Sequence, residues 1–337
     1  MIPKNGYTYA VSRLKAMANR LLDNNSIIRL WESETFSSAM KLLSETHYAQ
    51  WLSEMKNEND FESLISSELN YVVSETRSIS PDKRIPILFQ LPFDFHNIKV
   101  LVKDKITRTG NQGRRIDLLT SLGNVSVEDL ILAVESEDYR LLPFGLHAVL
   151  PESLSIWEQS HDVLMVEKRL DAALFELMKS IAESIEIEGV KKWVRAKIDA
   201  ENIRNVLRLV RFGLEIGKIS SFLHEGGFIS KEKLLLLVNE PLEGWGRLVG
   251  FADAAMALSE ITDFSDTEKS LTELEKSLDD YVTGVLGPYR YDAFAPENIL
   301  AFLWAKDIEA KNLRIILVGK ANDVDKDVIR GLLRNVL

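Results

Sequence analysis

Cysteine is absent from this 337-residue chain. Its absence excludes disulfides, thiolate catalysis and cysteine-ligated metals, and it is typical of a protein kept in a reducing cytoplasm. Glycine (17) and proline (9) are too scarce for a loop-rich sandwich. Long apolar runs are also lacking, since the longest aliphatic run covers residues 234–238, against the roughly 20 residues that cross a bilayer. Residues 1–7 carry no apolar secretory signal, so we expect neither export nor a membrane span.

The chain has fewer basic than acidic residues, 41 against 51, so its net charge is −10. A protein that binds nucleic acid through phosphates needs clustered Lys and Arg, so no nucleic-acid partner is expected. The net charge is unevenly distributed along the sequence. It is +1 for residues 1–110, −5 for residues 111–215 and −6 for residues 216–337. This asymmetry favours an acidic surface that meets a basic protein partner. Solubility alone is the alternative explanation.

Catalytic and ligand-binding patterns are also missing. No histidine has a second histidine or a carboxylate at the helical spacing of a zinc site. Gly319-Lys320 lacks the glycine and the hydroxyl residue of a phosphate-binding loop, and the glycines of residues 244–250 miss the dinucleotide spacing. We therefore predict no enzyme activity and no catalytic, cofactor-binding or metal-binding residues. The histidines considered as zinc ligands, and set aside for lack of a partner at the right spacing, are His47, His96, His147, His161 and His224.

What the chain does contain is helical periodicity from end to end. Apolar residues recur at three- and four-residue steps in residues 9–22, 61–73, 163–185, 194–209 and 271–285, whereas no stretch alternates with the period of a strand. The predicted fold class is all-α. Each proline is expected to begin or end a helix. Residues 109–115 and 212–220 are the candidate linkers.

Three sets of similar residues recur in the same order along the chain. The first set is residues 30–33, 133–136 and 237–240; the second is 68–71, 169–172 and 277–280; the third is 97–101, 202–207 and 312–317. Corresponding positions are separated by 101–110 residues. We interpret them as three homologous helical domains, residues 1–110, 111–216 and 217–337.

The third set places an asparagine followed by a base inside each Leu-rich helix. Asparagine is unfavourable in a helix interior because its amide competes for backbone hydrogen bonds. Its recurrence predicts a use for the amide, and the favoured one is to tie the helix to a neighbour within its domain. A repeated contact with a partner is the alternative, and the interface with partners stays unknown. The six residues are Asn97, Asn202 and Asn312, with Lys99, Arg204 and Arg314 two positions after them.

Four segments carry a resemblance to a known family: residues 7–16 (YTYAVSRLKA), 93–99 (FDFHNIK), 197–204 (KIDAENIR) and 309–320 (EAKNLRIILVGK). The chain resembles the C subunit of archaeal and bacterial V/A-type ATP synthases, which is equivalent to the d subunit of vacuolar ATPases. The resemblance extends from Tyr7 to near Arg330, and its last segment is the most specific.

The resemblance implies three similar helical domains arranged as a pseudo-threefold funnel. It also implies a non-catalytic central-stalk (rotor) subunit on the cytoplasmic face of the membrane. Its partners would be the D- and F-type shaft subunits and the membrane rotor ring, with rotation coupled to proton or sodium transport. One alternative is a helical-repeat scaffold that binds a protein in its concave face, which would show a period of about 34–47 residues. The other is a helical enzyme that uses a pair of carboxylates with shifted pKa values.

Overall fold

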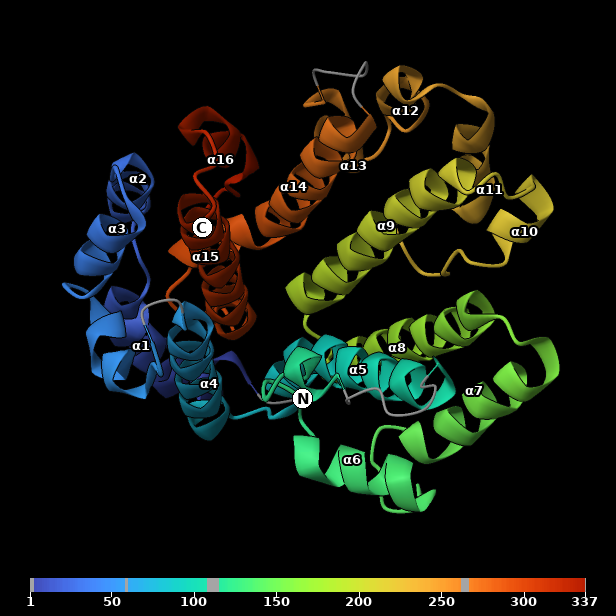
Figure 1. Cartoon of the computed structure of the whole chain (residues 1–337), viewed down its shortest axis with the longest axis horizontal. Coiled ribbons are helices and arrows are strands. Elements are labelled where there is room, and N and C mark those ends of the chain that lie inside the picture. Colours follow the sequence, from blue (N-terminus) through green and yellow to red (C-terminus); the bar gives the residue numbers. More distant parts are fainter. Residues whose placement is uncertain (1–2, 58–59, 108–114, 262–266, 337) are drawn as a thin grey trace. The chain divides into compact units, whose positions relative to one another are not determined.

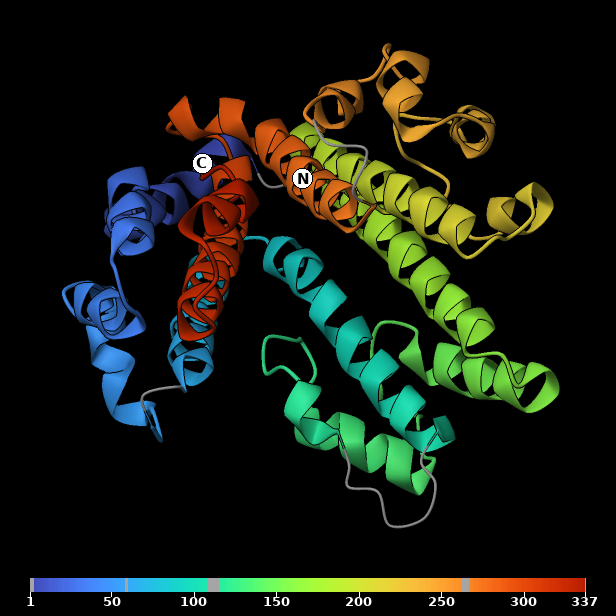
Figure 2. The same ribbon diagram turned by 45° about the horizontal axis from the view of Figure 1, so that its top comes forward.

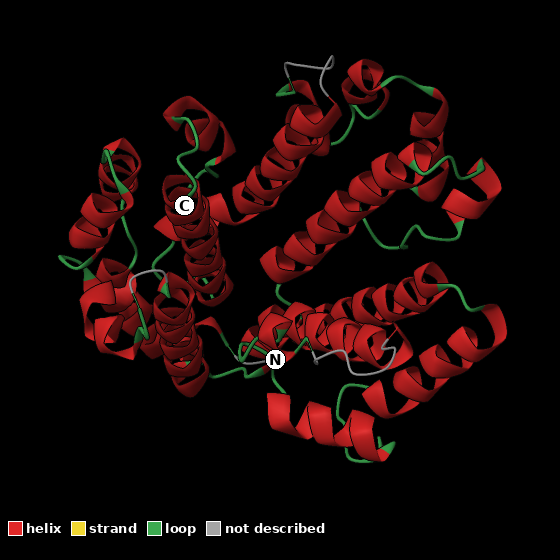
Figure 3. Cartoon of the chain, in the orientation of Figure 1, coloured by secondary structure: helices red, strands yellow, loops and turns green. Residues whose placement is uncertain are grey.

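The computed structural model describes residues 3–57, 60–107, 115–261 and 267–336. These residues form helices joined by short loops and contain no strand (Figures 1 and 3). The prediction of an all-α fold is confirmed. No helix among them is both long and apolar enough to cross a membrane.

The chain divides into two compact units. The first combines residues 1–86 with residues 185–337, so its helices come from both ends of the sequence. In chain order its α-helices are α1 (Thr8–Met17), α2 (Asn24–Glu32), α3 (Phe36–Leu43), α4 (Phe61–Ile79), α9 (Glu188–Arg211), α10 (Ile216–Ser220), α11 (Lys231–Leu236), α12 (Leu242–Leu248), α13 (Ala254–Ser259), α14 (Thr267–Leu286), α15 (Glu297–Ala321) and α16 (Lys326–Leu332). Its 3-10 helices are η1 (Lys4–Tyr7), η2 (Ala18–Arg20), η3 (His47–Glu54), η5 (Leu237–Asn239) and η6 (Gly287–Tyr291).

The second unit covers residues 87–184. It holds most of α5 (Arg84–Thr107), then η4 (Ile116–Leu118), α6 (Val127–Ser136) and α7 (Leu146–Ser160), and nearly all of α8 (Val163–Ile185). Its core is aliphatic and aromatic, with Leu91, Phe95, Ile98, Leu130 and Met178 fully buried or nearly so.

Pairs of long helices build the core of the first unit. α4 packs along α15, and α9 packs along α14 (Figures 1 and 2). α15 is enclosed along most of its length, because residues on every side of it are buried, from Ile299 to Leu317. Polar residues on such a helix must find partners inside the protein, since an unpaired buried polar group is costly. The functional site described below consists of these residues and their counterparts on α5 and α9.

Three short helices begin at side chains that cap free backbone N–H groups. Asp23 caps α2 by accepting from the N–H of Ser26, Ser126 caps α6, and Ser230 caps α11. These three caps are separated by 103 and 104 residues. That spacing equals the interval between the first of the repeated residue sets.

The expectation that every proline begins or ends a helix is wrong at two positions. Pro92 lies inside α5 and Pro151 inside α7. An interior proline removes one backbone hydrogen bond and costs about 3 kcal/mol. Burial of Leu88, Leu91 and Phe95 around Pro92 outweighs that local cost, because tertiary packing supplies most of the stability of a helix in a protein. Pro296, by contrast, agrees with the expectation, since α15 begins at the next residue.

The predicted boundaries between the three domains, after residues 110 and 216, can be compared with the described residues and with the two compact units. Residue 110 and most of the candidate linker 109–115 lie outside the described residues. Gly217 lies in α10, within the second candidate linker. The compact unit 87–184 takes residues from both sides of position 110. The division into three homologous domains stays a prediction.

Candidate functional site: buried carboxylate and asparagine anchors

The three repeated asparagines make the same contact in three long helices. Asn97 on α5, Asn202 on α9 and Asn312 on α15 are each 0% exposed. The Nδ2 of Asn97 donates to the carbonyl of Thr120 (2.7 Å), and its Oδ1 accepts from the N–H of the same residue (2.8 Å). Asn202 pairs with both backbone groups of His224 (2.9 and 2.7 Å). Asn312 pairs in the same way with Arg334 (2.9 and 2.8 Å).

Each amide therefore ties a long helix to a backbone position 22 or 23 residues further along the chain. An asparagine side chain carries one donor group and one acceptor group, so it can satisfy the N–H and the C=O of one residue at once. A carboxylate could not do so, because it has no donor when ionised. This requirement explains why the residue is Asn in all three helices despite its low helix propensity.

The bases two positions later pair with carboxylates. Lys99 contacts Asp171 on α8. Arg314 binds Glu62 on α4 with a bidentate pair of hydrogen bonds, at 2.6 and 2.9 Å. Arg204 pairs with Glu201, one turn earlier on its own helix. All three are ion-paired residues rather than free cations.

A carboxylate three residues before each asparagine forms a second repeated contact, which the sequence analysis did not single out. We call the carboxylate and the asparagine together an anchor pair. The anchor pairs are Asp94 with Asn97, Asp199 with Asn202, and Glu309 with Asn312. Each carboxylate accepts a backbone N–H: from Val125 (3.0 Å), from Ile229 (3.1 Å) and from Leu22 (2.6 Å), respectively.

These three donors stand immediately before the capping residues of α6, α11 and α2, and they are separated by 103 and 104 residues. The anchor carboxylates thus hold the starts of three corresponding helices. The signal was present in the sequence as an acid at a fixed distance before each asparagine. It was weakened because the third acid is Glu instead of Asp.

Glycine sits against two of the anchor carboxylates. Gly123 and Gly227 are 104 residues apart. A methyl group on Gly123 would overlap the Oδ1 of Asp94, and one on Gly227 would overlap the Oδ1 of Asp199. Only a residue without a Cβ lets the loop approach the carboxylate this closely. These glycines belong to the same repeated contact.

Asp199 has a strongly altered proton affinity. Burial raises the pKa of its carboxyl to about 6, although the N–H groups of Ile229 and Phe228 oppose that change by stabilising the carboxylate. The phenol of Tyr281 also donates to Asp199, at 3.5 Å. The anchor is therefore held by several donors but titrates in the mildly acidic range.

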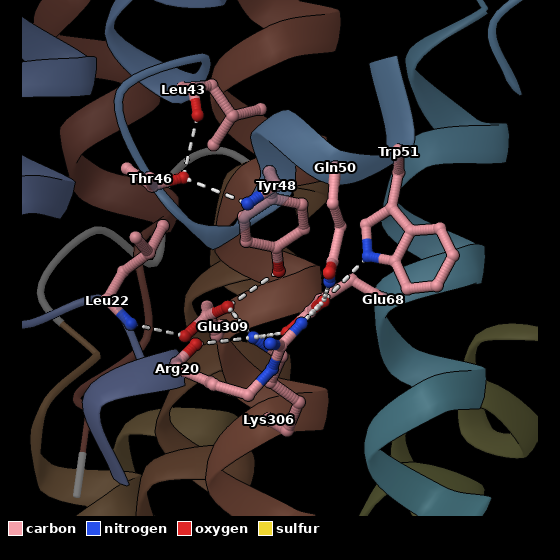
Figure 4. A network of polar contacts seen from close by, with 10 residues as sticks. All are labelled: Arg20, Leu22, Leu43, Thr46, Tyr48, Gln50, Trp51, Glu68, Lys306 and Glu309. Atoms are coloured by element: carbon pink, nitrogen blue, oxygen red, sulfur yellow. Dashed lines mark hydrogen bonds and ion pairs between the residues drawn. The ribbon is translucent and has the colours of Figure 1, made fainter. Parts of the chain in front are cut away.

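Glu309 belongs to a larger buried network (Figure 4). Its Oε1 accepts from the hydroxyl of Tyr48 (2.6 Å) and from the ammonium of Lys306 (2.7 Å). Lys306 is 0% exposed, and it also pairs with Glu68 on α4 at 3.2 Å. A third bond from Lys306 goes to the carbonyl of Arg20 (2.7 Å). A buried ammonium is tolerated only when it is paired and hydrogen-bonded in this way.

Glu68 is the second centre of the network. Its carboxylate accepts from the guanidinium of Arg20, the indole N–H of Trp51 (2.7 Å) and the amide of Gln50 (3.1 Å). Burial acts to raise the pKa of Glu68, but Lys306, Arg20 and Trp51 together outweigh burial and lower it. Both carboxylates of the network are thus balanced by the two cations Lys306 and Arg20.

This network joins helices, and its central side chains are closed off from solvent. Tyr48, Glu68, Lys306 and Glu309 are no more than 1% exposed. Burial and the neighbouring Glu309 raise the pKa of Tyr48 well above 10, so its hydroxyl stays a hydrogen-bond donor. In the described part of the chain, no group of three or more His, Asp and Glu side chains could hold a metal ion.

The fold and these contacts define an all-helical chain whose long helices carry repeated, buried anchor pairs. The chain belongs to the ATP synthase (C/AC39) subunit family, whose model matches residues 10–332. It is 24% identical to the C subunit of the V-type sodium ATPase of Enterococcus hirae over 94% of both chains. It is 27% identical to the C subunit of the A-type ATP synthase of Methanocaldococcus jannaschii, over 97% of this chain and 86% of the relative. The corresponding protein of Pyrococcus furiosus is 24% identical, over 98% and 90%.

Proposed function

We propose that this chain is a non-catalytic central-stalk (rotor) subunit of a V/A-type ATP synthase or ATPase. In that role it couples the D- and F-type shaft subunits to the membrane rotor ring, so that rotation and proton or sodium transport are linked. The observation that carries the proposal is the family match over residues 10–332, together with relatives named as the C subunits of such complexes.

We also propose that the chain consists of three homologous helical domains arranged around a pseudo-threefold axis, as the sequence analysis predicts. The anchor pairs support three repeated units, although the contacts from α5 and α9 cross the predicted boundaries after residues 110 and 216. Each links a long helix to a following backbone position through its asparagine and holds the start of a short helix through its carboxylate. Their spacing of 105 and 110 residues differs from the 34–47 residues of common helical-repeat scaffolds.

A protein that transmits torque needs a stiff body, and the first compact unit has contacts that supply stiffness. Its N-terminal and C-terminal segments are joined by buried bonds, including Glu309 to Leu22 and Lys306 to Arg20. The ammonium of Lys320 adds bonds to the carbonyls of Trp31 and Ser33. Buried, fully paired networks hold one arrangement more firmly than exposed ion pairs do.

Recovery of the native complex tests the proposal most directly. The tagged chain, purified from membranes of its own cells under mild conditions, should bring with it the shaft and rotor-ring subunits at the cytoplasmic face. The purified chain alone should show no saturable ATP binding by calorimetry. Recovery without any other component of a rotary complex would overturn the proposal.

The negative net charge allows a second test, which asks whether charge guides the association with the shaft subunits. If charge guides docking, raising the salt concentration to about 0.5 M, where the Debye length is about 4 Å, should slow association with the shaft subunits markedly. An association rate independent of salt would leave the net charge of −10 with a role in solubility only.

A further inference from the structure

Lys197 on α9 is a cation without a charged partner. Among the described residues it makes no hydrogen bond and no ion pair. Its Nζ lies 4.9 Å from the ring centroid of Trp304 and 5.9 Å from that of Trp193. The two indoles meet edge to face at 5.7 Å, and the indole N–H of Trp304 donates to Thr283 at 2.8 Å. The ammonium of Lys197 therefore lies beside the two packed indole rings of Trp193 and Trp304.

A second lysine lies near the same Trp304 ring. The Nζ of Lys311 on α15 lies 5.0 Å from the Trp304 centroid. Lys311 is paired with Asp279 at 3.3 Å and with Asp307 at 3.4 Å. Asp279 also forms an ion pair with Arg334, whose Nε lies 3.2 Å from the Oδ2 of Asp279.

Positive charge is in excess at this place. The cations Lys197, Lys311 and Arg334 face the two carboxylates Asp279 and Asp307, which leaves one positive charge uncompensated. Arg204, which also acts on Asp279, brings its own partner Glu201 and does not change the balance. Lys197 is half-buried and 31% of the Lys311 side chain is exposed, so solvent reaches both lysines.

We propose that Lys197, Lys311 and Arg334 form a binding site for a small oxyanion of the phosphate class, taken from solution. An oxyanion would supply the missing acceptor for Lys197 and would offset the excess positive charge. Charge-assisted bonds to phosphate oxygens are among the stronger hydrogen bonds in proteins. The site lies outside the anchor pairs, and the proposal does not depend on the proposed function.

The proton affinity of Lys197 is consistent with a cation that lacks an acceptor. Burial and the repulsion of Lys311 lower the pKa of Lys197 to about 8, although Asp279 opposes this. The pKa of Lys311 is raised instead, because Asp307 and Asp279 outweigh the effect of burial. A bound oxyanion would raise the pKa of Lys197 towards its usual range.

Competitive acetylation of the intact wild-type chain tests the site directly. The protein is treated at pH 8 with an amine-acetylating reagent over a series of inorganic phosphate concentrations, and each lysine is quantified by mass spectrometry. Phosphate should slow acetylation of Lys197 with saturation in the millimolar range. Lys192, which is exposed on the same helix, should be unaffected. Sodium chloride at equal ionic strength should not protect Lys197.

The variant Lys197→Met keeps the length of the side chain and removes the charge. Calorimetric affinity for phosphate should fall about tenfold or more, since one charge-assisted hydrogen bond is lost. Lys192→Met is the matched control and should bind as wild type does. Equal protection of Lys192 and Lys197, equal protection by chloride, or undiminished affinity in the Lys197→Met variant would overturn the proposal. If this variant does not fold, the acetylation measurement on wild type decides alone.

Discussion

The Oε2 of Glu309 accepts a hydrogen bond of 2.6 Å from the backbone N–H of Leu22, 287 residues earlier in the chain. The corresponding carboxylates Asp94 and Asp199 hold backbone positions only 31 and 30 residues later. The contact is the same in kind, but at Glu309 it joins the C-terminal long helix to the N-terminal segment. Such a bond makes the two ends of the sequence parts of one folded body.

Glu309→Gln should destabilise the first unit by about 3–5 kcal/mol, because it removes one of two carboxylates that compensate the buried ammonium of Lys306. Urea unfolding followed by circular dichroism measures the loss. Glu62→Gln is the matched control. It breaks the pair with Arg314, in which the Glu62 side chain is 53% exposed, and should cost no more than about 1 kcal/mol. Equal losses in the two variants would contradict the importance of the buried network.

Asn202→Ala should remove both hydrogen bonds that the amide makes to the buried backbone of His224, at a cost of about 2–4 kcal/mol. Hydrogen exchange gives a local measurement, because the amide of His224 should be protected in wild type and exchange much faster in the variant. Asn97→Ala and Asn312→Ala should have the same effect at Thr120 and Arg334.

Asn322 provides the control for this series. It is exposed near the end of α15, and its amide donates only to the carbonyl of Val318. Asn322→Ala should change stability by less than about 0.5 kcal/mol. Unchanged exchange at all three anchor positions would show that the amides are dispensable.

The sequence was sufficient for the fold class and for one half of each anchor pair. Apolar periodicity predicts helices well when they are long, and Asn97, Asn202 and Asn312 were recognisable because asparagine is unexpected inside a helix. The carboxylates were harder to find, since Asp and Glu are common. Most of them lie on the protein surface, where contact with solvent is enough to explain them. The network around Glu68 could not be predicted at all. It depends on Lys306, which is brought to α4 only by the packing of α15.

Gly227→Ala should destabilise the protein by about 1–3 kcal/mol, because the added methyl group would displace Asp199 from the backbone it holds. Gly217→Ala is the matched control. Gly217 lies in α10, and nothing is within 4 Å of the place its Cβ would take. Alanine there should be neutral or stabilising by up to about 1 kcal/mol, since it has the higher helix propensity. Thermal unfolding of both variants should therefore move in opposite directions or differ by several degrees.

The carboxyl of Asp199 should titrate with a midpoint near pH 6, where burial places its pKa, instead of near its ordinary value of 3.8. Because the folded state then binds this proton more tightly than the unfolded state does, the contribution of Asp199 to stability grows as the pH falls from about 6.5 to 4. Over that window wild type should gain about 2–3 kcal/mol relative to Asp199→Asn, which cannot titrate. Urea unfolding of both proteins at a series of pH values measures this difference, and the carboxyl carbon shift in NMR gives the midpoint independently. A midpoint below pH 4 would mean that the N–H groups of Phe228 and Ile229 stabilise the carboxylate more than burial destabilises it.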